Sequence, residues 1–257
     1  MPSEDDIFTS ELTFEYPPAC YDTAPFEAVP LASPTDPDEV YPTHLKKVEP
    51  GKSSRSFRIL ATIRPHRKSM LQQVWCASQE EYGVCLCLAA HPEVVGLREQ
   101  FARLKYRKPN GRPGSTLVDF LCLKRDGSQV YVSVKYPQKA RRASYRSEVE
   151  EIARQAITSS SESFAIASRQ CFGSRYLKKA QMIHYVRKGW DPEADKIVLR
   201  QVPPDTKQRS IGEVLAGSDL EYGRAFRAIA RLIGDGDVQI GFYDPIEDAT
   251  NCWRASL

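Results

Sequence analysis

The sequence predicts an α/β protein in which a mixed β-sheet is flanked by helices and followed by a small C-terminal α+β unit. Two observations lead to this class. Residues 78–188 show the order helix, strand, hairpin, helix, strand, helix, and residues 189–257 change to short helices and a final strand. The chain has 257 residues, 41% of them hydrophobic, so it contains enough apolar material for a core.

The first 52 residues differ from the rest in charge and in proline content. The whole chain has a formal net charge of +3, but residues 1–45 contain ten Asp and Glu and no Lys or Arg. The other 212 residues therefore hold 36 basic and 23 acidic residues. Nine of the 18 prolines lie in residues 1–52, which disfavours helices and central strands there. We expect an acidic, proline-rich tail that is extended, either disordered or wrapped over a basic surface.

Residues 53–188 contain the elements of the main domain. Residues 53–68 are basic and free of acids, which is typical of irregular or edge-strand chain near a polyanion. Ser78 and Glu81 have the spacing of a capping box, so a core helix is predicted over residues 78–90. The remaining patterns predict strands at 94–105, 117–123 and 130–135, a turn at 126–128, a helix at 144–158, a strand at 163–167 and a helix at 174–188.

Strand 130–135 alternates strictly between two kinds of side chain. We expect its three valines to face the core, and Tyr131, Ser133 and Lys135 to face a cleft or solvent. After the Trp-Asp-Pro sequence at 190–192 come an apolar segment at 197–199, two helical stretches at 211–215 and 219–233, and a strand at 238–243. Residues 189–257 are thus predicted to form a small interaction unit, for which a winged helix is one candidate.

Several classes of protein are disfavoured by composition. The longest stretch without a polar residue is residues 84–90, far short of the roughly 20 residues that cross a bilayer, and the acidic N-terminus lacks the basic start of a signal peptide. The seven cysteines are scattered without any Cys-x-x-Cys pair, so we expect reduced thiols in a cytoplasmic protein without a membrane partner. The sequence has no glycine-rich phosphate loop and no nucleophile elbow, which leaves nucleotide hydrolysis and acyl transfer unsupported.

Asp119 is a carboxylate within an otherwise apolar strand, where it needs a metal ion, a cation or hydrogen bonds as compensation. Two hairpin registers are open. A three-residue loop at 126–128 places Asp119 opposite Lys135, with Ser133 on the same face, whereas a two-residue turn places it opposite Val134. We favour the first, because the second buries a bare charge among valines.

An Asp on one strand and a Lys on the next form the layout of restriction-endonuclease-like nucleases. In that chemistry the Asp and a backbone carbonyl hold Mg²⁺, and the Lys orients or deprotonates the attacking water. Asp and x-x-Lys also recur by chance in hairpins. On its own, a lone strand Asp is more often a structural hydrogen-bond acceptor.

A longer pattern makes the motif more specific. The sequence has Ser78-x-x-Glu81, His91-Pro92, the tetrapeptide Arg98-Glu99-Gln100-Phe101, Val118-Asp119-Phe120-Leu121, Asp126-Gly127 and Val132-Ser133-Val134-Lys135-Tyr136-Pro137. This pattern, between residues 53 and 188, resembles the TnsA family, the endonuclease subunit of heteromeric cut-and-paste transposases. The resemblance implies a restriction-endonuclease-like domain at 53–188 that cuts the 5′, non-transferred strands at transposon ends.

The same resemblance implies a catalytic set of Glu81, Asp119 and Lys135. Glu81 and Asp119 would be ligands of Mg²⁺, or of Mn²⁺ in its place, together with the Val134 carbonyl. Ser133 stands where the family has Gln, and its shorter hydroxyl is a weaker ligand, so it puts two-metal chemistry in doubt. Glu80 is the alternative to Glu81, although Glu81 can also be explained as the helix cap alone. Glu99 and Gln100 are interpreted as structural or site-supporting.

The implied partners are double-stranded DNA at the transposon ends, a TnsB-like transposase subunit that cuts and joins the 3′ ends, and a TnsC-like AAA+ regulator. The last would contact residues 189–257, and the active protein would work at the bacterial nucleoid. Basic side chains near the motif are candidates for phosphate contacts, although a solvated charged face explains about half of such residues. The candidates are Arg98, Lys105, Lys139, Arg141, Arg142 and Arg146.

Two other functions stay open at this stage. One is a resolvase or restriction-type nuclease on the same fold, which would act without a transposase partner. The other is a DNA-binding adaptor whose catalytic site has decayed, as Ser133 suggests. The other nuclease differs from the TnsA-like function because it needs no transposase partner. The adaptor differs because it does not bind Mg²⁺ or Mn²⁺ through Asp119.

Removal of the acidic tail is expected to strengthen non-specific DNA binding. If the tail competes with DNA for the basic surface, deletion of residues 1–45 lowers the dissociation constant for a random duplex at low salt. Fluorescence anisotropy with a labelled duplex measures this change. An unchanged dissociation constant would count against competition.

Overall fold

The computed structural model describes residues 40–42, 58–100, 103–108, 110–157, 162–189, 191–204 and 207–255. The predicted tail at residues 1–52 therefore lies outside the described residues, apart from 40–42. Strand β1 (Val40–Pro42) pairs in parallel with β3 (Leu71–Cys76), which pairs antiparallel with β2 (Ile59–Ile63). This edge position agrees with extended chain at the end of the tail. The ten acids of residues 1–45 all precede β1, so a deletion of residues 1–39 removes them and keeps the strand.

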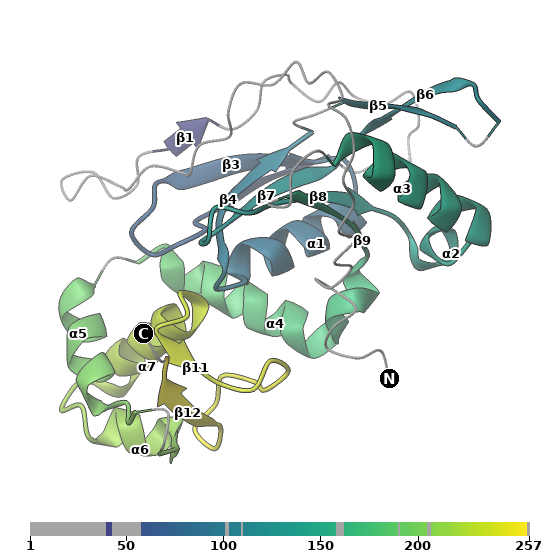
Figure 1. The fold of residues 1–257 in the computed structure, drawn as a ribbon. Helices are drawn as coiled ribbons and strands as arrows, with labels where there is room; N and C mark the ends of the chain where they lie inside the picture. The colour runs from purple at the N-terminus through teal and green to yellow at the C-terminus, as the bar shows by residue number, and fades with distance from the viewer. Residues whose placement is uncertain are drawn as a thin grey trace.

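The central sheet is mixed, as predicted. It contains β4 (Val94–Glu99), β7 (Phe120–Lys124), β8 (Gln129–Val134) and β9 (Glu162–Ala167), in the order β4-β7-β8-β9. The first two pairings are antiparallel and the last is parallel. Helices cover both faces, so the fold is α/β with three layers (Figure 1).

One face of the sheet packs on α1 (Gln79–Ala90) and α4 (Arg169–Arg187), and the other packs on α3 (Ala143–Ala156), which follows the short α2 (Pro137–Ala140). The valines of β8 lie in the core beside α1, which confirms that half of the alternation. Tyr131 and Ser133 were expected to face a cleft or solvent, but they are 5% and 1% exposed. The expectation was wrong because α3 covers this face and Tyr131 packs against it.

Two predicted strands are interrupted in the structure. The segment 94–105 divides into β4 and β5 (Arg103–Arg107), after Gln100 takes a positive φ of 45°. The segment 117–123 divides into β6 (Pro113–Leu117) and β7, and Asp119 lies in the break. Strands β5 and β6 form a separate two-stranded ribbon. Each of the two predicted strands therefore lies partly in the central sheet and partly in this ribbon.

The hairpin register differs from both predicted registers. Leu123 pairs with Gln129, and the loop consists of residues 125–127, with Gly127 at a φ of 83°. The three-residue loop was therefore placed one residue too far along the chain. Phe120 pairs with Val132, so Asp119 comes alongside Ser133 and not opposite Lys135. Asp126 is the middle residue of this loop, and its side chain accepts the Ser128 N–H, which suits an Asx turn.

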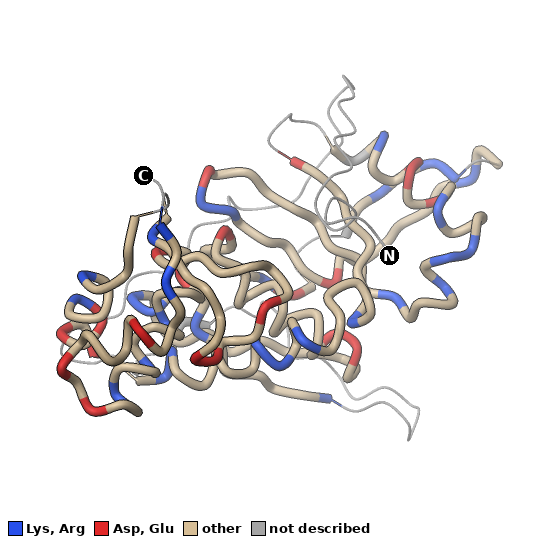
Figure 2. The backbone as a smooth tube through the Cα atoms, turned by 90° about the horizontal axis from the view of Figure 1, so that it is seen from below, with Lys and Arg blue, Asp and Glu red and all other residues tan. Residues whose placement is uncertain are grey.

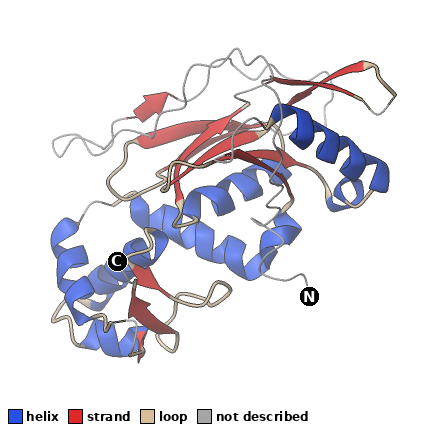
Figure 3. Ribbon diagram, in the orientation of Figure 1, coloured by secondary structure: helices blue, strands red, loops and turns tan. Residues whose placement is uncertain are grey.

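Residues 191–255 form the C-terminal unit (Figure 3). Its elements are α5 (Pro192–Gln201), β10 (Arg209–Ser210), α6 (Ile211–Ala216), α7 (Tyr222–Gly234), β11 (Val238–Gln239) and β12 (Asn251–Arg254). The apolar segment 197–199 belongs to α5, which begins because Asp191 accepts the Ala194 N–H and Pro192 follows it. The strand expected at 238–243 ends at Gln239 and pairs with β12, which was not predicted.

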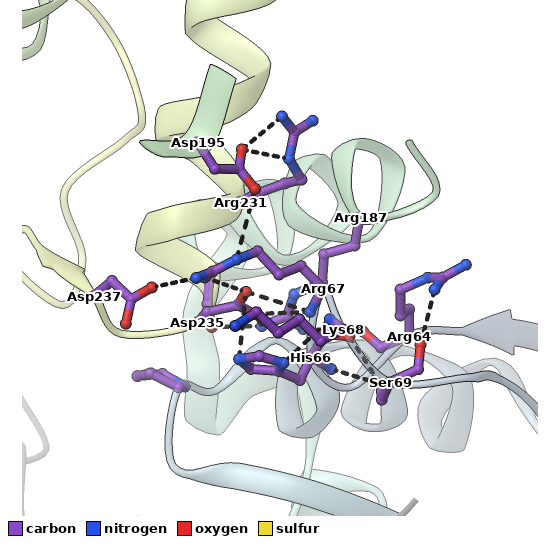
Figure 4. Close-up of polar contacts among 12 residues, drawn as sticks. Arg64, His66, Arg67, Lys68, Ser69, Arg187, Asp195, Arg231, Asp235 and Asp237 are labelled. Carbon is purple, nitrogen blue, oxygen red and sulfur yellow. Dashed lines mark hydrogen bonds and ion pairs between the residues drawn. The ribbon is translucent and has the colours of Figure 1, made fainter. Parts of the chain in front are cut away.

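A buried charge cluster joins the C-terminal unit to the main domain (Figure 4). Arg187 of α4 and Asp235 after α7 are paired at 3.0 Å, and their side chains are 1% and 0% exposed. Arg67, in the loop between β2 and β3, reaches the same carboxylate at 2.7 Å and also pairs with Asp237 at 2.6 Å. Arg231 of α7 pairs with Asp195 of α5. These contacts connect three segments that are distant in sequence.

The six cysteines within the described residues are free thiols, five of them buried, which agrees with the predicted reduced state. In the same part of the chain, none of the helices has the length and apolar composition needed to span a bilayer.

Substitution of Asp235 is expected to destabilise the protein strongly. Asp235→Ala leaves the buried Arg187 guanidinium without its carboxylate and should lower the free energy of unfolding by about 3–5 kcal/mol. Urea denaturation followed by circular dichroism measures this change. Asp237→Ala is the matched control, because its carboxylate is 36% exposed and its pair with Arg67 contributes no more than about 1 kcal/mol. If both variants lost a similar small amount of unfolding free energy, the proposed contribution of the Arg187–Asp235 pair to stability would be contradicted.

Candidate active site

The Asp119 carboxylate is the centre of the candidate site. Its backbone links the ribbon to the sheet, because its N–H donates to the Val132 carbonyl and its carbonyl accepts from Gln100. Its Oδ2 accepts three hydrogen bonds, which come from Ser133 Oγ at 3.3 Å, the Val134 N–H at 2.7 Å and Lys135 Nζ at 3.1 Å. Oδ1 accepts no hydrogen bond from the described residues, so it faces the site with its lone pairs available.

Lys135 meets Asp119 even though the two residues are not opposite each other. Lys135 follows the last residue of β8, and its backbone N–H donates to the carbonyl of Ala167, the last residue of β9. Its side chain folds back, so that Nζ donates to Asp119 Oδ2 at 3.1 Å and to the Val134 carbonyl at 2.8 Å. The two side chains are 23% and 18% exposed. The ammonium therefore lies between two oxygen atoms at a place that solvent can reach.

Glu81 comes to the same region from the N-terminus of α1. Ser78 caps this helix by accepting the Glu81 N–H at 3.1 Å, and Glu81 Oε2 accepts the Ala77 N–H at 2.7 Å. The structural role expected for Glu81 at the helix start is therefore present. Glu81 Oε1 has one long contact, 3.4 Å from Ser78 Oγ. A carboxylate oxygen with two lone pairs keeps capacity for a further ligand in this arrangement.

Electrostatics show that Glu81 interacts with the other two groups. Burial raises the pKa of the Glu81 carboxyl above its ordinary value, the Ala77 N–H lowers it, the Asp119 charge raises it and Lys135 lowers it. The structure thus joins Asp119, Lys135, Ser133 and the Val134 carbonyl in one hydrogen-bonded group, and Glu81 is near enough for the charges of Asp119 and Lys135 to act on its pKa.

Tyr145 is a member of the site that the sequence interpretation missed. Its hydroxyl lies 3.1 Å from Ser133 Oγ, which in turn donates to Asp119. The Lys139 ammonium lies over the Tyr145 ring at 5.5 Å from its centroid. Tyr145 is in α3, and the one signal in the sequence is its position within the acid-free run that begins at Lys135. The phenol supports the short Ser133 side chain from the opposite layer.

Other acidic candidates have structural roles. Glu80, the alternative to Glu81, is 5% exposed and is paired with Arg169 at the start of α4. Glu99 is also buried, and its Oε1 accepts the Trp75 N–H. Gln100 supports the site through its N–H bond to the Asp119 carbonyl. These positions agree with the structural interpretation of Glu99 and Gln100.

The predicted DNA-contact residues fall into two groups. Arg98 is half-buried in β4, beside Leu121, so it is not part of the exposed basic surface. The others are exposed around α2, the start of α3 and β5, and they are Lys105, Lys139, Arg141, Arg142 and Arg146. Figure 2 shows Lys and Arg gathered at this end of the molecule, while Asp and Glu are frequent around the C-terminal unit at the other end.

The donor atoms suit a hard cation such as Mg²⁺. Two carboxylates and a backbone carbonyl are oxygen ligands of the kind that Mg²⁺ and Mn²⁺ prefer. The Lys135 ammonium contacts two of these oxygens, so the site already stabilises positive charge there. Among the described residues there is no group of three or more His, Cys, Asp or Glu side chains placed to hold a metal ion. A metal bound here would depend on the Val134 carbonyl, water or substrate oxygens to complete its ligands.

Comparison with known proteins adds no relative. No protein-family model matches the chain, and no curated protein matches it either. The TnsA resemblance is therefore a hypothesis that rests on the motif residues alone.

The raised pKa of Glu81 predicts a pH dependence of stability. The folded state holds the Glu81 proton more tightly than the unfolded state does, so this contribution to stability is present below the ordinary pKa of 4.5 and is lost as the pH rises through the raised value. Glu81→Gln should remove this loss. Urea unfolding between pH 4 and 8 should show the wild-type protein becoming less stable relative to the variant as the pH increases.

The exposed Glu93→Gln provides a matched control for this pH series. A difference between wild type and Glu81→Gln that stays constant from pH 4 to 8 would contradict the assigned burial of the Glu81 charge.

Proposed function

We propose that the protein is a Mg²⁺-dependent DNA endonuclease with a restriction-endonuclease-like fold. The observation that carries the proposal is the meeting of Asp119 Oδ2, Lys135 Nζ and the Val134 carbonyl at the end of β8. Glu81 approaches this group from a different layer of the fold. A carboxylate, a carbonyl and an ammonium in contact at a partly exposed point, with a second carboxylate near enough to act on them electrostatically, are the kinds of group that metal-assisted phosphodiester hydrolysis requires.

Each residue of the site has a role that follows from its contacts. Glu81, Asp119 and the Val134 carbonyl would hold Mg²⁺, which supplies Lewis-acid stabilisation of the phosphate charge and lowers the pKa of a bound water. The Lys135 ammonium donates to the two oxygens beside that position and orients the attacking water. Ser133 and Tyr145 position the Asp119 carboxylate through their hydrogen bonds. The substrate phosphate would enter from the side of the exposed basic residues.

Charge distribution supports DNA as the substrate of the main domain. Residues 46–188 carry 28 Lys and Arg against 11 Asp and Glu, whereas residues 189–257 carry 8 against 12. The run from Lys135 to Arg146 has five basic residues and no acid, and it starts at the candidate site. Phosphate binding with counterion release fits this surface.

Within this proposal the DNA is a transposon end, and the enzyme cuts its 5′ strand beside a TnsB-like subunit that acts on the 3′ strand. The motif residues from Ser78 to Pro137 support this more specific assignment. The C-terminal unit has the order helix, strand, helix, helix, strand, strand around a three-stranded sheet, which supports a winged helix. Because its residues are net acidic, a protein such as a TnsC-like regulator is a better-supported partner for it than DNA.

Loss of Asp119 or Lys135 should abolish cleavage of the 5′ strand. Asp119→Asn and Lys135→Met are each expected to lower the cleavage rate by at least about 100-fold, because one removes a ligand charge and the other a proton-handling group. The measurement is strand-specific cleavage of a labelled transposon-end duplex, with Mg²⁺ and the transposase partner present. Asp126→Asn and Lys178→Met are the matched controls. Intact 5′ cleavage in either site variant would show that the site is wrongly assigned.

One observation favours a second candidate, a DNA-binding adaptor without catalysis. Ser133 stands at a ligand position, and the Lys135 ammonium satisfies the two oxygens that a metal would use. Titration with Mn²⁺, followed by electron paramagnetic resonance, distinguishes the two. Binding that is lost in Asp119→Asn supports the nuclease, and the absence of Asp119-dependent binding supports the adaptor. Cleavage without any transposase partner would instead indicate a resolvase or restriction-type nuclease.

A further inference from the structure

The ribbon formed by β5 and β6 is a separate structural feature next to the candidate site. Its strands pair with each other, from Arg103 with Leu117 to Arg107 with Pro113, and among the described residues they belong to no larger sheet. Figure 1 shows the ribbon extending from the body beyond the sheet, over the end of α3. The ribbon has no assigned role in the chemistry of Asp119.

One face of the ribbon is fixed to α3. Leu104 and Tyr106 are 1% and 6% exposed, and they pack with Val149 and Ile152. The Tyr106 ring lies over Gly114, where a side chain would collide with it, and the Tyr106 hydroxyl bonds to Glu148. At Arg107 the Gln155 side chain accepts the backbone N–H at 2.6 Å and donates to the carbonyl at 2.9 Å. The ribbon is therefore held against α3 along its length, from Leu104 to Arg107, and in the described part of the chain its opposite face and tip stay free to contact DNA.

The other face and the tip carry positive charge. Lys105 and Arg107 are exposed on the face away from α3, and Lys108 and Arg112 are exposed at the tip. Residues 103–117 include five Lys and Arg and no Asp or Glu. None of the four exposed cations has an ion-pair partner among the described residues. Their neighbours on β6 are the small residues Pro113, Gly114 and Ser115, which keep the ribbon thin.

The ribbon is connected directly to the candidate site. β6 ends at Leu117, two residues before Asp119, and Gln100, which precedes β5, donates to the Asp119 carbonyl. At about 3.3 Å per residue, a five-residue strand and its turn place the tip roughly 20 Å from its base. This distance corresponds to about six base pairs of B-form DNA, at about 3.4 Å for each step.

We infer that the β5–β6 ribbon is a DNA-docking arm that enters the major groove of a duplex, about six base pairs from the phosphodiester at Asp119. The inference rests on the proposed nuclease function and adds a binding site to it. The major groove is about 12 Å wide and admits a two-stranded ribbon. Lys105, Arg107, Lys108 and Arg112 then lie close to the phosphates on both sides of the groove.

The test uses the full-length protein and a random-sequence 40-base-pair duplex, with Ca²⁺ in place of Mg²⁺. The arm variant carries Lys105→Gln, Arg107→Gln, Lys108→Gln and Arg112→Gln. Fluorescence anisotropy at salt concentrations from 50 to 300 mM should show the slope of log affinity against log salt reduced by about 2–4, and affinity lowered at least about tenfold near 100 mM. The matched control removes four exposed cations elsewhere, through Arg175→Gln, Lys178→Gln, Lys196→Gln and Arg200→Gln, and should change the slope by less than about 1.

A second probe tests the groove itself. A double-stranded RNA of the same sequence has a deep, narrow major groove that excludes the ribbon, so the wild-type protein should bind it no better than the arm variant does. An equal loss of affinity for single-stranded DNA in the arm variant would overturn the groove assignment. If the arm variant has the wild-type urea midpoint and an unchanged salt slope on the duplex, the assignment of the ribbon as a DNA-docking arm is wrong.

Cleavage assays separate this inference from the proposed function. If the arm variant binds the duplex as the wild type does while Asp119→Asn loses cleavage, the arm is wrong and the nuclease assignment stands. If the arm variant loses duplex binding while Asp119→Asn still cleaves, the arm stands and the assigned site is wrong. If the wild-type protein does not bind the duplex, the inference that the ribbon is a DNA-docking arm is wrong.

Discussion

The buried Arg187 guanidinium is the interaction on which the arrangement of the molecule depends. It pairs with Asp235 and donates to carbonyls of three other segments, namely Arg64 after β2, Ala89 near the end of α1 and Gly234 at the end of α7. A cation this deeply buried is stable only when carbonyls and a carboxylate replace its water. Since α1 is held at its C-terminal end by this group, the contact that attaches the C-terminal unit also fixes the helix whose first turn carries Glu81.

The candidate site depends on a local break in regular structure. Asp119 lies between β6 and β7, and its carboxylate satisfies donors from three consecutive residues at the end of β8. A continuous strand would have kept this side chain within the sheet, between layers that exclude water. The break instead leaves it partly exposed beside Lys135, which is where a phosphodiester and its metal could reach it.

Local patterns predicted the elements of the central sheet and its main helices, whereas β3, α5 and β12 and the long-range contacts were not predicted. Helix α1 was placed correctly because Ser78 caps it, and the mixed sheet followed from the order of apolar runs. The hairpin loop was predicted one residue too far along the chain, which shifted the expected partner of Asp119 by two residues, because Gly127 fits the last position of a loop at 125–127 as well as a middle one. Tyr145 and the Arg67–Asp235 pair could not be found, since they join residues whose separation in sequence carries no periodic signal. The meeting of Asp119 with Lys135 was predicted from the wrong register, and it occurs because a lysine side chain is long enough to fold back.

The short connection between the ribbon and the sheet has a mechanical consequence. Val118 and Asp119 alone join β6 to β7, and Val118 is fully buried, so it acts as a pivot. A load applied at the ribbon tip would pass to α3 through the Arg107–Gln155 bonds, and along β6 to the Asp119 backbone. The shape of whatever the ribbon touches is thereby transmitted to the helix that carries Tyr145 and to the backbone of one carboxylate.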